Sequence, residues 1–245
     1  MGLKVAFMIV GALIAVMAFV AGAVGFWLTI KYFRFNRREN SLGLTGTELA
    51  RKILDDNGLQ HIKVKRTGSL LFGNSYSHYF KKVRLRGFIR HQTSLTSMGM
   101  GAQKAALAIL DKEGDPDMKK RIRLLPFLVF GPFAFFPLIL LGAVLDYFII
   151  KGSGVCTIAL VTIGLVFYVY AIVISVMTLK TEKKAQNKAY EILQNDYHVT
   201  PEELSDLKTL FRLYNIQYIN DIILSSLEFI HMALQIAIVI YDKKN

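Results

Sequence analysis

The chain has 245 residues, of which 53% are hydrophobic, and its mean hydropathy is +0.38. The apolar residues are concentrated in a few long blocks rather than in short periodic stretches, which excludes an ordinary water-soluble globular protein. The single cysteine, Cys156, excludes an intramolecular disulfide and a cysteine-based zinc site. Length and composition leave room for one small domain outside the membrane.

The net charge of +12 is unevenly distributed. Between Lys31 and Arg123 there are 20 Lys and Arg against 8 Asp and Glu, so this segment alone accounts for the whole net charge. Basic loops beside apolar spans stay in the cytoplasm, so the segment predicts a cytoplasmic domain. Such residues also attract anionic lipid headgroups. No nucleic-acid recognition motif accompanies the charge, and we expect no nucleic-acid partner.

The first apolar block, Val5–Ile30, contains no charged residue and is long enough to cross a bilayer. Lys4 precedes it, whereas Lys31 and Arg34 begin a heavier positive flank after it. The pattern predicts an uncleaved signal anchor, residues 1–33, with its N-terminus outside the cell.

Residues 34–123 contain the capping and turn residues that mark the helices and strands of a small folded domain. Thr45 and Glu48 have the spacing of a capping box at the start of a helix. In chain order the pattern predicts a helix from Thr45 to Asn57, a strand over His61–Arg66, a strand region over Asn74–Arg86 and a helix over Ser94–Leu110. The small residues between Gly99 and Ala108 predict close packing of that last helix.

Residues 124–179 are predicted to form a transmembrane hairpin. Its first span is Leu124–Ile150, its turn is Lys151–Gly154 and its second span is Val155–Leu179. The first span contains three prolines, which are expected to kink it or break its first turns, namely Pro126, Pro132 and Pro137.

Residues 180–220 are predicted to be a cytoplasmic helical segment, in which Thr200 and Glu203 form a second capping box. Residues 221–245 are predicted to form either a fourth span or a helix lying on the membrane surface.

Three ionisable residues lie in apolar blocks and are candidate intramembrane polar residues: Asp146, Glu228 and His231. A contact between Asp146 and His231 would favour a transport function, because intramembrane charges seek partners.

The order of these segments and several motifs resemble the bacterial membrane-bound neutral zinc metallopeptidases of the YugP type. The matching residues are Thr45-Gly46, Ala50-Arg51, Ile53-Leu54, Asn57-Gly58-Leu59, Val83-Arg84-Leu85, Ser94, Leu179, Glu182, Ala185, Ala189, Glu191-Ile192-Leu193 and Thr200-Pro201-Glu202-Glu203-Leu204. The resemblance implies an α+β membrane protein with three to four transmembrane helices and a small zincin-like cytoplasmic domain.

The residues that the family uses to hold zinc are replaced in this sequence. Where the family has His-Glu-x-x-His, the aligned positions are Gln103, Lys104 and Leu107. Two imidazoles one helical turn apart hold the metal in such motifs, and the glutamate accepts a proton from metal-bound water. The family's Asp-His-Tyr-Asp stretch is here residues 74–77, Asn-Ser-Tyr-Ser, and Glu182 alone is retained. We therefore expect no bound zinc and no catalytic residue.

Two interpretations of Glu182 remain open. It can belong to a solvated charged face at a membrane exit. Alternatively, Lys104 meets Glu182 where zinc would have been, and its ammonium replaces the positive charge of the metal. The five histidines include no pair with i,i+4 spacing, so a metal site would need an unconventional set such as His78, His91 and Glu182.

The sequence thus predicts a multi-pass cell-membrane protein that is a catalytically inactive homologue of a zinc metallopeptidase. Its expected role is that of a scaffold or binding partner for other membrane proteins, with the lipid bilayer as its surroundings. One alternative is an active zinc-dependent membrane peptidase with noncanonical ligands. Another is a membrane transport or lipid-binding protein that uses the basic face or the polar last helix.

Overall fold

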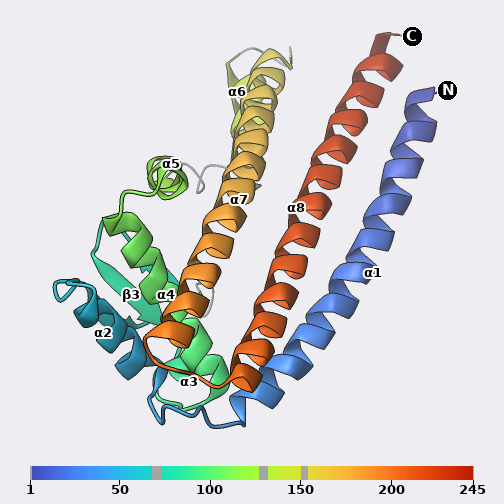
Figure 1. Ribbon diagram of the computed structural model, residues 1–245. Coiled ribbons are helices and arrows are strands. Elements are labelled where there is room, and N and C mark those ends of the chain that lie inside the picture. Colours follow the sequence, from blue (N-terminus) through green and yellow to red (C-terminus); the bar gives the residue numbers. More distant parts are fainter. Residues whose placement is uncertain (1, 68–72, 127–131, 150–153, 245) are drawn as a thin grey trace. The chain divides into compact units, whose positions relative to one another are not determined.

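The computed structural model describes residues 2–67, 73–126, 132–149 and 154–244. The described protein is mostly helical with one small sheet (Figure 1). Its elements in chain order are α1 (Gly2–Asn36), α2 (Gly46–Asp56), β1 (Lys63–Arg66), β2 (Ser75–Ser77), β3 (Lys82–Leu85), α3 (Gly87–Arg90), α4 (Leu95–Lys112), α5 (Pro116–Leu124), α6 (Pro132–Phe148), α7 (Val155–Asn195) and α8 (Pro201–Lys244).

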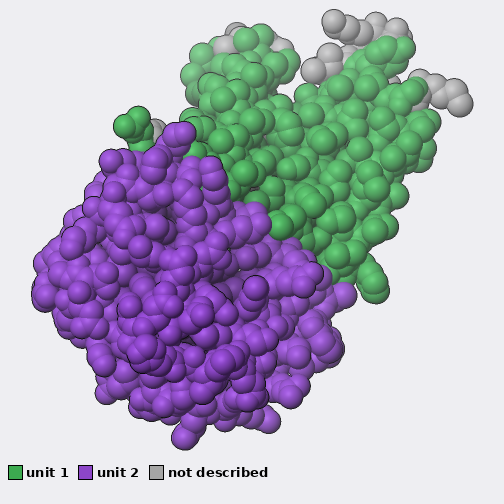
Figure 2. Space-filling model, viewed as in Figure 1, with its two compact units in different colours: residues 1–22, 123–178, 218–245 green, residues 23–122, 179–217 purple. Residues whose placement is uncertain are grey.

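The chain divides into two compact units, shown in Figure 2. Unit 1 contains Met1–Gly22, Arg123–Thr178 and Tyr218–Asn245, and unit 2 contains Ala23–Ile122 and Leu179–Gln217. Helices α1, α7 and α8 each contribute residues to both units.

Among the described residues, three helices are long and apolar enough to cross a membrane by length and composition: α1, α7 and α8. Helix α7 continues without a break from Val155 to Asn195, well beyond the expected end of the span at Leu179. Helix α8 is likewise continuous from Pro201, so the cytoplasmic segment and the last apolar segment expected from the sequence share one helix.

The expected span Leu124–Ile150 is not one continuous described helix. Helix α5 ends at Leu124, residues 127–131 and 150 lie outside the described residues, and α6 begins at Pro132. Proline is favoured at the first helical position because it has no N–H to donate. With 17 residues, α6 falls in the class of shorter apolar helices. The predicted turn at residues 151–153 also lies outside the described residues.

The start and end of α2 agree with the sequence prediction. Thr45 Oγ1 accepts a hydrogen bond from the Glu48 N–H, and the Glu48 carboxylate accepts one from the Thr45 N–H, at 3.2 and 2.8 Å. After the C-cap Asn57, Gly58 adopts φ +67°, a conformation that glycine reaches without the steric cost of a Cβ.

The second predicted capping box is only half present. Pro201 begins α8, and Thr200 Oγ1 accepts a hydrogen bond from the Glu203 N–H at 3.4 Å. The Glu203 carboxylate, however, receives the N–H and the hydroxyl of Ser41 at 2.8 and 2.5 Å. This carboxylate therefore ties the start of α8 to the loop after α1.

The sheet has the strand order β1-β3-β2, with β1 parallel and β2 antiparallel to β3. The expected strand region over residues 74–86 is thus a hairpin, with β2 and β3 joined by a turn. Val83 and Leu85 are both fully buried, as their alternation on one face predicts.

Helix α4 lies at the centre of unit 2. Every residue from Leu95 to Leu110 is buried, so this helix is covered on all sides rather than on one stripe. Gly101 permits a close approach of α4 to α2, because a Cβ added at this position would lie 2.5 Å from the backbone oxygen of Gly46 in α2. The small residues of α4 therefore serve close helix packing, as predicted. Because α4 carries the residues aligned with the zinc motif, the fold places these residues in the protein interior.

Candidate functional site

The residues aligned with the zinc motif lie in the middle of α4. The helix is capped by Ser94, whose hydroxyl oxygen accepts the Ser97 N–H at 3.1 Å. Gln103 and Leu107 are one turn apart and share a helix face. Gln103, Lys104 and Leu107 are 5%, 7% and 1% exposed.

Glu182 of α7 meets these residues inside unit 2. Lys104 Nζ donates to Glu182 Oε2 at 2.7 Å, and Gln103 Nε2 donates to the same oxygen at 2.9 Å. Arg121 donates to Glu182 Oε1 at 3.0 Å and to the Thr181 hydroxyl at 2.9 Å. We call these five residues the Glu182 cluster. The predicted contact between Lys104 and Glu182 is present.

The Glu182 cluster is largely shielded from solvent. The side chains of Lys104, Arg121 and Glu182 are 9%, 13% and 17% exposed. The alternative of a solvated charged face at Glu182 is therefore wrong, because α4 and α5 cover the carboxylate from two directions.

The two cations keep Glu182 ionised. Burial by itself raises the pKa of this carboxyl, but the charges and hydrogen bonds of Lys104 and Arg121 outweigh it and hold the pKa below its ordinary value. The carboxylate has one negative charge and two positive partners, so the cluster carries a net positive charge.

Further ion pairs join α5 to α7 beside the cluster. Lys184 lies 2.6 Å from both Asp115 and Asp117, and Lys180 lies 3.0 Å from Asp117. The hydrogen bonds from Lys184 and Lys180 hold the pKa of Asp117 below its ordinary value. These contacts fix the start of α5 on α7 and so position Arg121.

Sequence reasoning missed Arg121. It lies near the end of the basic segment Lys31–Arg123, whose charge predicts only a cytoplasmic domain. Its partner Glu182 is 61 residues away in the chain, and no local pattern links the two.

The donor set of the Glu182 cluster does not fit zinc. A bound ion would need imidazole or carboxylate donors converging in tetrahedral geometry. The Lys104 ammonium has no free lone pair, Leu107 has no ligating atom, and both Glu182 oxygens already accept N–H groups. Among the described residues, no group of three or more His, Cys, Asp and Glu could hold a metal.

The unconventional set of His78, His91 and Glu182 is not brought together. His78 Nδ1 lies 2.6 Å from Asp111 Oδ2, which also accepts the Tyr76 hydroxyl at 2.6 Å. Burial and, next, this hydrogen bond raise the pKa of Tyr76. His91 is exposed at the C-terminal end of α3. His78 therefore belongs to a separate cluster at the end of α4.

The candidate intramembrane polar residues have separate partners within unit 1. Asp146 of α6 accepts the N–H groups of Cys156 and Thr157 at 2.9 and 2.8 Å, and so caps the start of α7. Glu228 accepts the Tyr168 hydroxyl at 3.3 Å. Each of these carboxylates thus contacts α7.

His231 has a different environment. Its ring stacks on Phe7 of α1, with centroids 3.9 Å apart. The contact between Asp146 and His231 that would favour transport is not formed, because Asp146 caps α7 instead.

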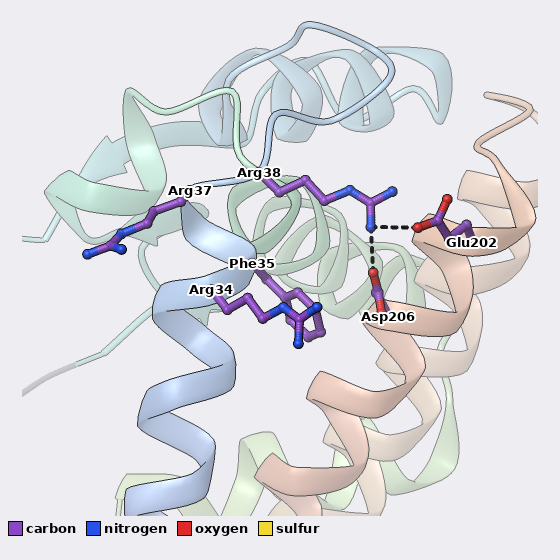
Figure 3. Close-up of a pocket in the computed structure, with 6 residues that line it drawn as sticks. All are labelled: Arg34, Phe35, Arg37, Arg38, Glu202 and Asp206. Carbon is purple, nitrogen blue, oxygen red and sulfur yellow. Dashed lines mark hydrogen bonds and ion pairs between the residues drawn. The ribbon is translucent and has the colours of Figure 1, made fainter.

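A pocket of unit 2 is lined by residues at the end of α1 and the start of α8, none of which belongs to the Glu182 cluster (Figure 3). Its lining residues are Arg34, Phe35, Arg37, Arg38, Glu202 and Asp206. Arg38 donates to Asp206 at 2.7 Å and pairs with Glu202 at 3.1 Å. Arg38 thus pairs with both carboxylates, and the contacts join the residues after α1 to the start of α8.

Comparison with known proteins agrees with the resemblance seen in the sequence. The chain is 23% identical over 215 residues to a Bacillus subtilis (strain 168) protein named "Putative membrane protease YugP", and the match covers 86% of this chain and 91% of that protein. No solved structure matches. The family described as "Putative neutral zinc metallopeptidase" matches residues 8–237, nearly the whole chain. The part of the chain that the structure describes has three helices apolar and long enough to cross a membrane, and this chain is a membrane protein that belongs to that zinc metallopeptidase family.

Proposed function

We propose that this chain is a catalytically inactive member of its family and acts as a scaffold or binding partner for other membrane proteins. The observation that carries the proposal is the 2.7 Å ion pair between Lys104 and Glu182. A lysine stands where the family's motif has the glutamate that accepts a proton from metal-bound water. A buried ammonium would repel a divalent ion at the same place.

The cluster supports a structural role for the altered site. Buried charges are stable when they are paired and hydrogen-bonded, and both oxygens of Glu182 have such partners. In this proposal Lys104 and Arg121 replace the charge of the metal and hold α4, α5 and α7 together. The fold would then persist without zinc.

The proposal includes a zincin-like origin for unit 2 and a cytoplasmic location for it. The charge distribution supports the location, because the basic excess between Lys31 and Arg123 follows the rule for cytoplasmic loops. Cysteine accessibility labelling from outside intact cells tests it. A cysteine introduced at Lys52, which is exposed on α2, should be protected from an impermeant reagent.

Metal and activity measurements on the purified full chain test the inactivity. We expect far less than one zinc per chain by elemental analysis and no chelator-sensitive hydrolysis of a protein substrate. The Bacillus subtilis relative, purified in the same detergent, serves as the comparison. Stoichiometric zinc that disappears in Glu182→Ala, together with hydrolysis, would overturn the proposal in favour of an active peptidase with noncanonical ligands.

A further inference from the structure

The turn between β2 and β3 exposes two aromatic side chains. Tyr79 is 59% and Phe80 is 66% exposed, although both lie in unit 2, whose apolar side chains are mostly in its core. Lys81 follows with φ +45°, the left-handed conformation of a tight turn. We call Tyr79–Lys82 the aromatic–basic turn. Tyr79 and Phe80 thus form a small exposed aromatic surface on this turn.

Cations surround the exposed ring. Lys82 Nζ lies 4.6 Å and Arg84 Cζ lies 5.7 Å from the centre of the Phe80 ring. No acidic residue occurs between Tyr79 and Arg90 in the sequence, although Asp111 Oδ2 of α4 lies 3.8 Å from Lys81 Nζ. The surface therefore combines an aromatic residue with positive charge and fits an anionic partner that also has an apolar layer.

The aromatic–basic turn is fixed to the end of α5. The Tyr79 hydroxyl donates to the Ile122 carbonyl at 3.0 Å, and this carbonyl belongs to the last turn of α5, where helix carbonyls lack intrahelical partners. The basic segment ends at the next residue, Arg123, and the apolar segment of the sequence begins at Leu124. The turn is thus held at the residue after which the chain becomes apolar. Lys119 and Lys120 of α5 are exposed as well.

We propose that the aromatic–basic turn binds anionic phospholipid headgroups of the membrane in which the chain's own apolar helices lie. Phe80 inserts at the level of the headgroups, where aromatic rings are favoured. Lys81 and Lys82 contact the lipid phosphates, since basic residues are attracted to an anionic leaflet. A single-stranded nucleic acid is less favoured, because no nucleic-acid recognition motif accompanies the charge.

Fluorescence of the full chain in lipid nanodiscs tests the proposal. Trp27 is the single tryptophan, so Trp27→Phe with Phe80→Trp places one reporter in the turn. In discs of phosphatidylcholine with phosphatidylglycerol, brominated acyl chains should quench this reporter, and quenching should be much weaker in phosphatidylcholine alone. Adding Lys81→Gln and Lys82→Gln should lower the equilibrium ratio of lipid-bound to unbound turn by roughly fivefold for each lysine.

A matched variant separates local binding from net charge. Lys52→Gln with Lys208→Gln removes two exposed lysines from α2 and α8 and should leave the quenching unchanged. Equal quenching in both kinds of disc, or none in either, would overturn the proposal. So would binding of a single-stranded oligonucleotide to the detergent-purified chain that is lost in Phe80→Ala. None of these readouts depends on zinc or peptidase activity, so the outcome is independent of the proposed function.

Discussion

Lys104 Nζ and Glu182 Oε2 lie 2.7 Å apart, although 78 residues separate them in the chain. The pair joins the central helix α4 to α7 and is completed by Arg121 from α5 on the other carboxylate oxygen. Three helices of unit 2 therefore meet at one carboxylate. The stability of unit 2 should depend on this carboxylate more than on any surface ion pair.

Replacing Glu182 by alanine should strongly destabilise the protein. The variant leaves Lys104 and Arg121 positively charged, poorly hydrated and without an anion. Breaking a buried pair in this way costs about 3–5 kcal/mol. Chemical denaturation of the detergent-purified chain, followed by circular dichroism, measures the loss.

An exposed pair supplies the control for this substitution. Glu113 lies 2.8 Å from Lys188, with side chains 47% and 32% exposed. Glu113→Ala should cost less than about 1 kcal/mol because solvent screens the pair. Equal effects of the two substitutions would show that Glu182 contributes no more than an ordinary surface carboxylate.

Acidification should destabilise the protein partly through Glu182. Its pKa in the folded state is held below the ordinary carboxyl value of 4.5. Its contribution to stability is therefore fully present above that ordinary value and is lost as the pH falls through the lower folded-state pKa.

The comparison with Glu182→Gln isolates this contribution, since Asp115 and Asp117 titrate in both proteins. The free energy of unfolding should fall less steeply with decreasing pH in the variant than in the wild type. Identical pH profiles would mean that Glu182 does not interact with its cations in the folded state.

Restoring the motif should restore metal binding. Gln103→His, Lys104→Glu and Leu107→His together place two imidazoles on one face of α4, and the Gln103 side chain already points at Glu182, with Nε2 2.9 Å from Oε2. We expect about one zinc per chain, as in three-residue zinc sites. Elemental analysis of the purified variant measures it.

The matched variant adds Glu182→Ala to the triple substitution and should lose the zinc. If the triple variant folds, by circular dichroism, yet binds no zinc, the alignment of α4 with the family's metal-binding helix is incorrect.

Adding a methyl group at Gly101 should destabilise the packing of α4 on α2. The new Cβ would lie 2.5 Å from the Gly46 backbone oxygen, and backbone cannot rotate away as a side chain does. Overpacking of this kind costs about 1–3 kcal/mol. Thermal unfolding of Gly101→Ala measures the effect.

Gly22→Ala in α1 is the control for this substitution. The added Cβ meets no atom within 4 Å, and the variant should be neutral or slightly stabilising, since alanine favours helices.

Local features of the fold could be predicted from the sequence. The capping box of Thr45 and Glu48 and the cap at Ser94 use hydrogen bonds that span three residues, so the sequence itself specifies them. The alternation of Val83 and Leu85 likewise predicts their common buried face. Apolar blocks predicted that α1 and α7 can cross a membrane, because length and hydropathy alone determine that property.

Features that depend on distant residues could not be predicted in the same way. Glu203 has the spacing of a capping box, yet its carboxylate binds Ser41, 162 residues away. Asp146 was considered as an intramembrane partner of His231, but the free N–H groups at the start of α7 take its oxygens. In both cases the carboxylate could have accepted hydrogen bonds from more than one partner, and the packing of the helices determines which partner it contacts.

The candidate site, too, could be predicted from the sequence only in part. The sequence alone determined that two imidazoles and a catalytic carboxylate are absent from residues 103, 104 and 107, since ligand chemistry follows from residue type. Only the tertiary structure decided that Lys104 is buried, that Arg121 shares Glu182 with it, and that the carboxylate is shielded from water. A charge gains or loses its partner according to which helices lie beside it, and that arrangement is fixed by the packing of the whole core rather than by neighbouring residues.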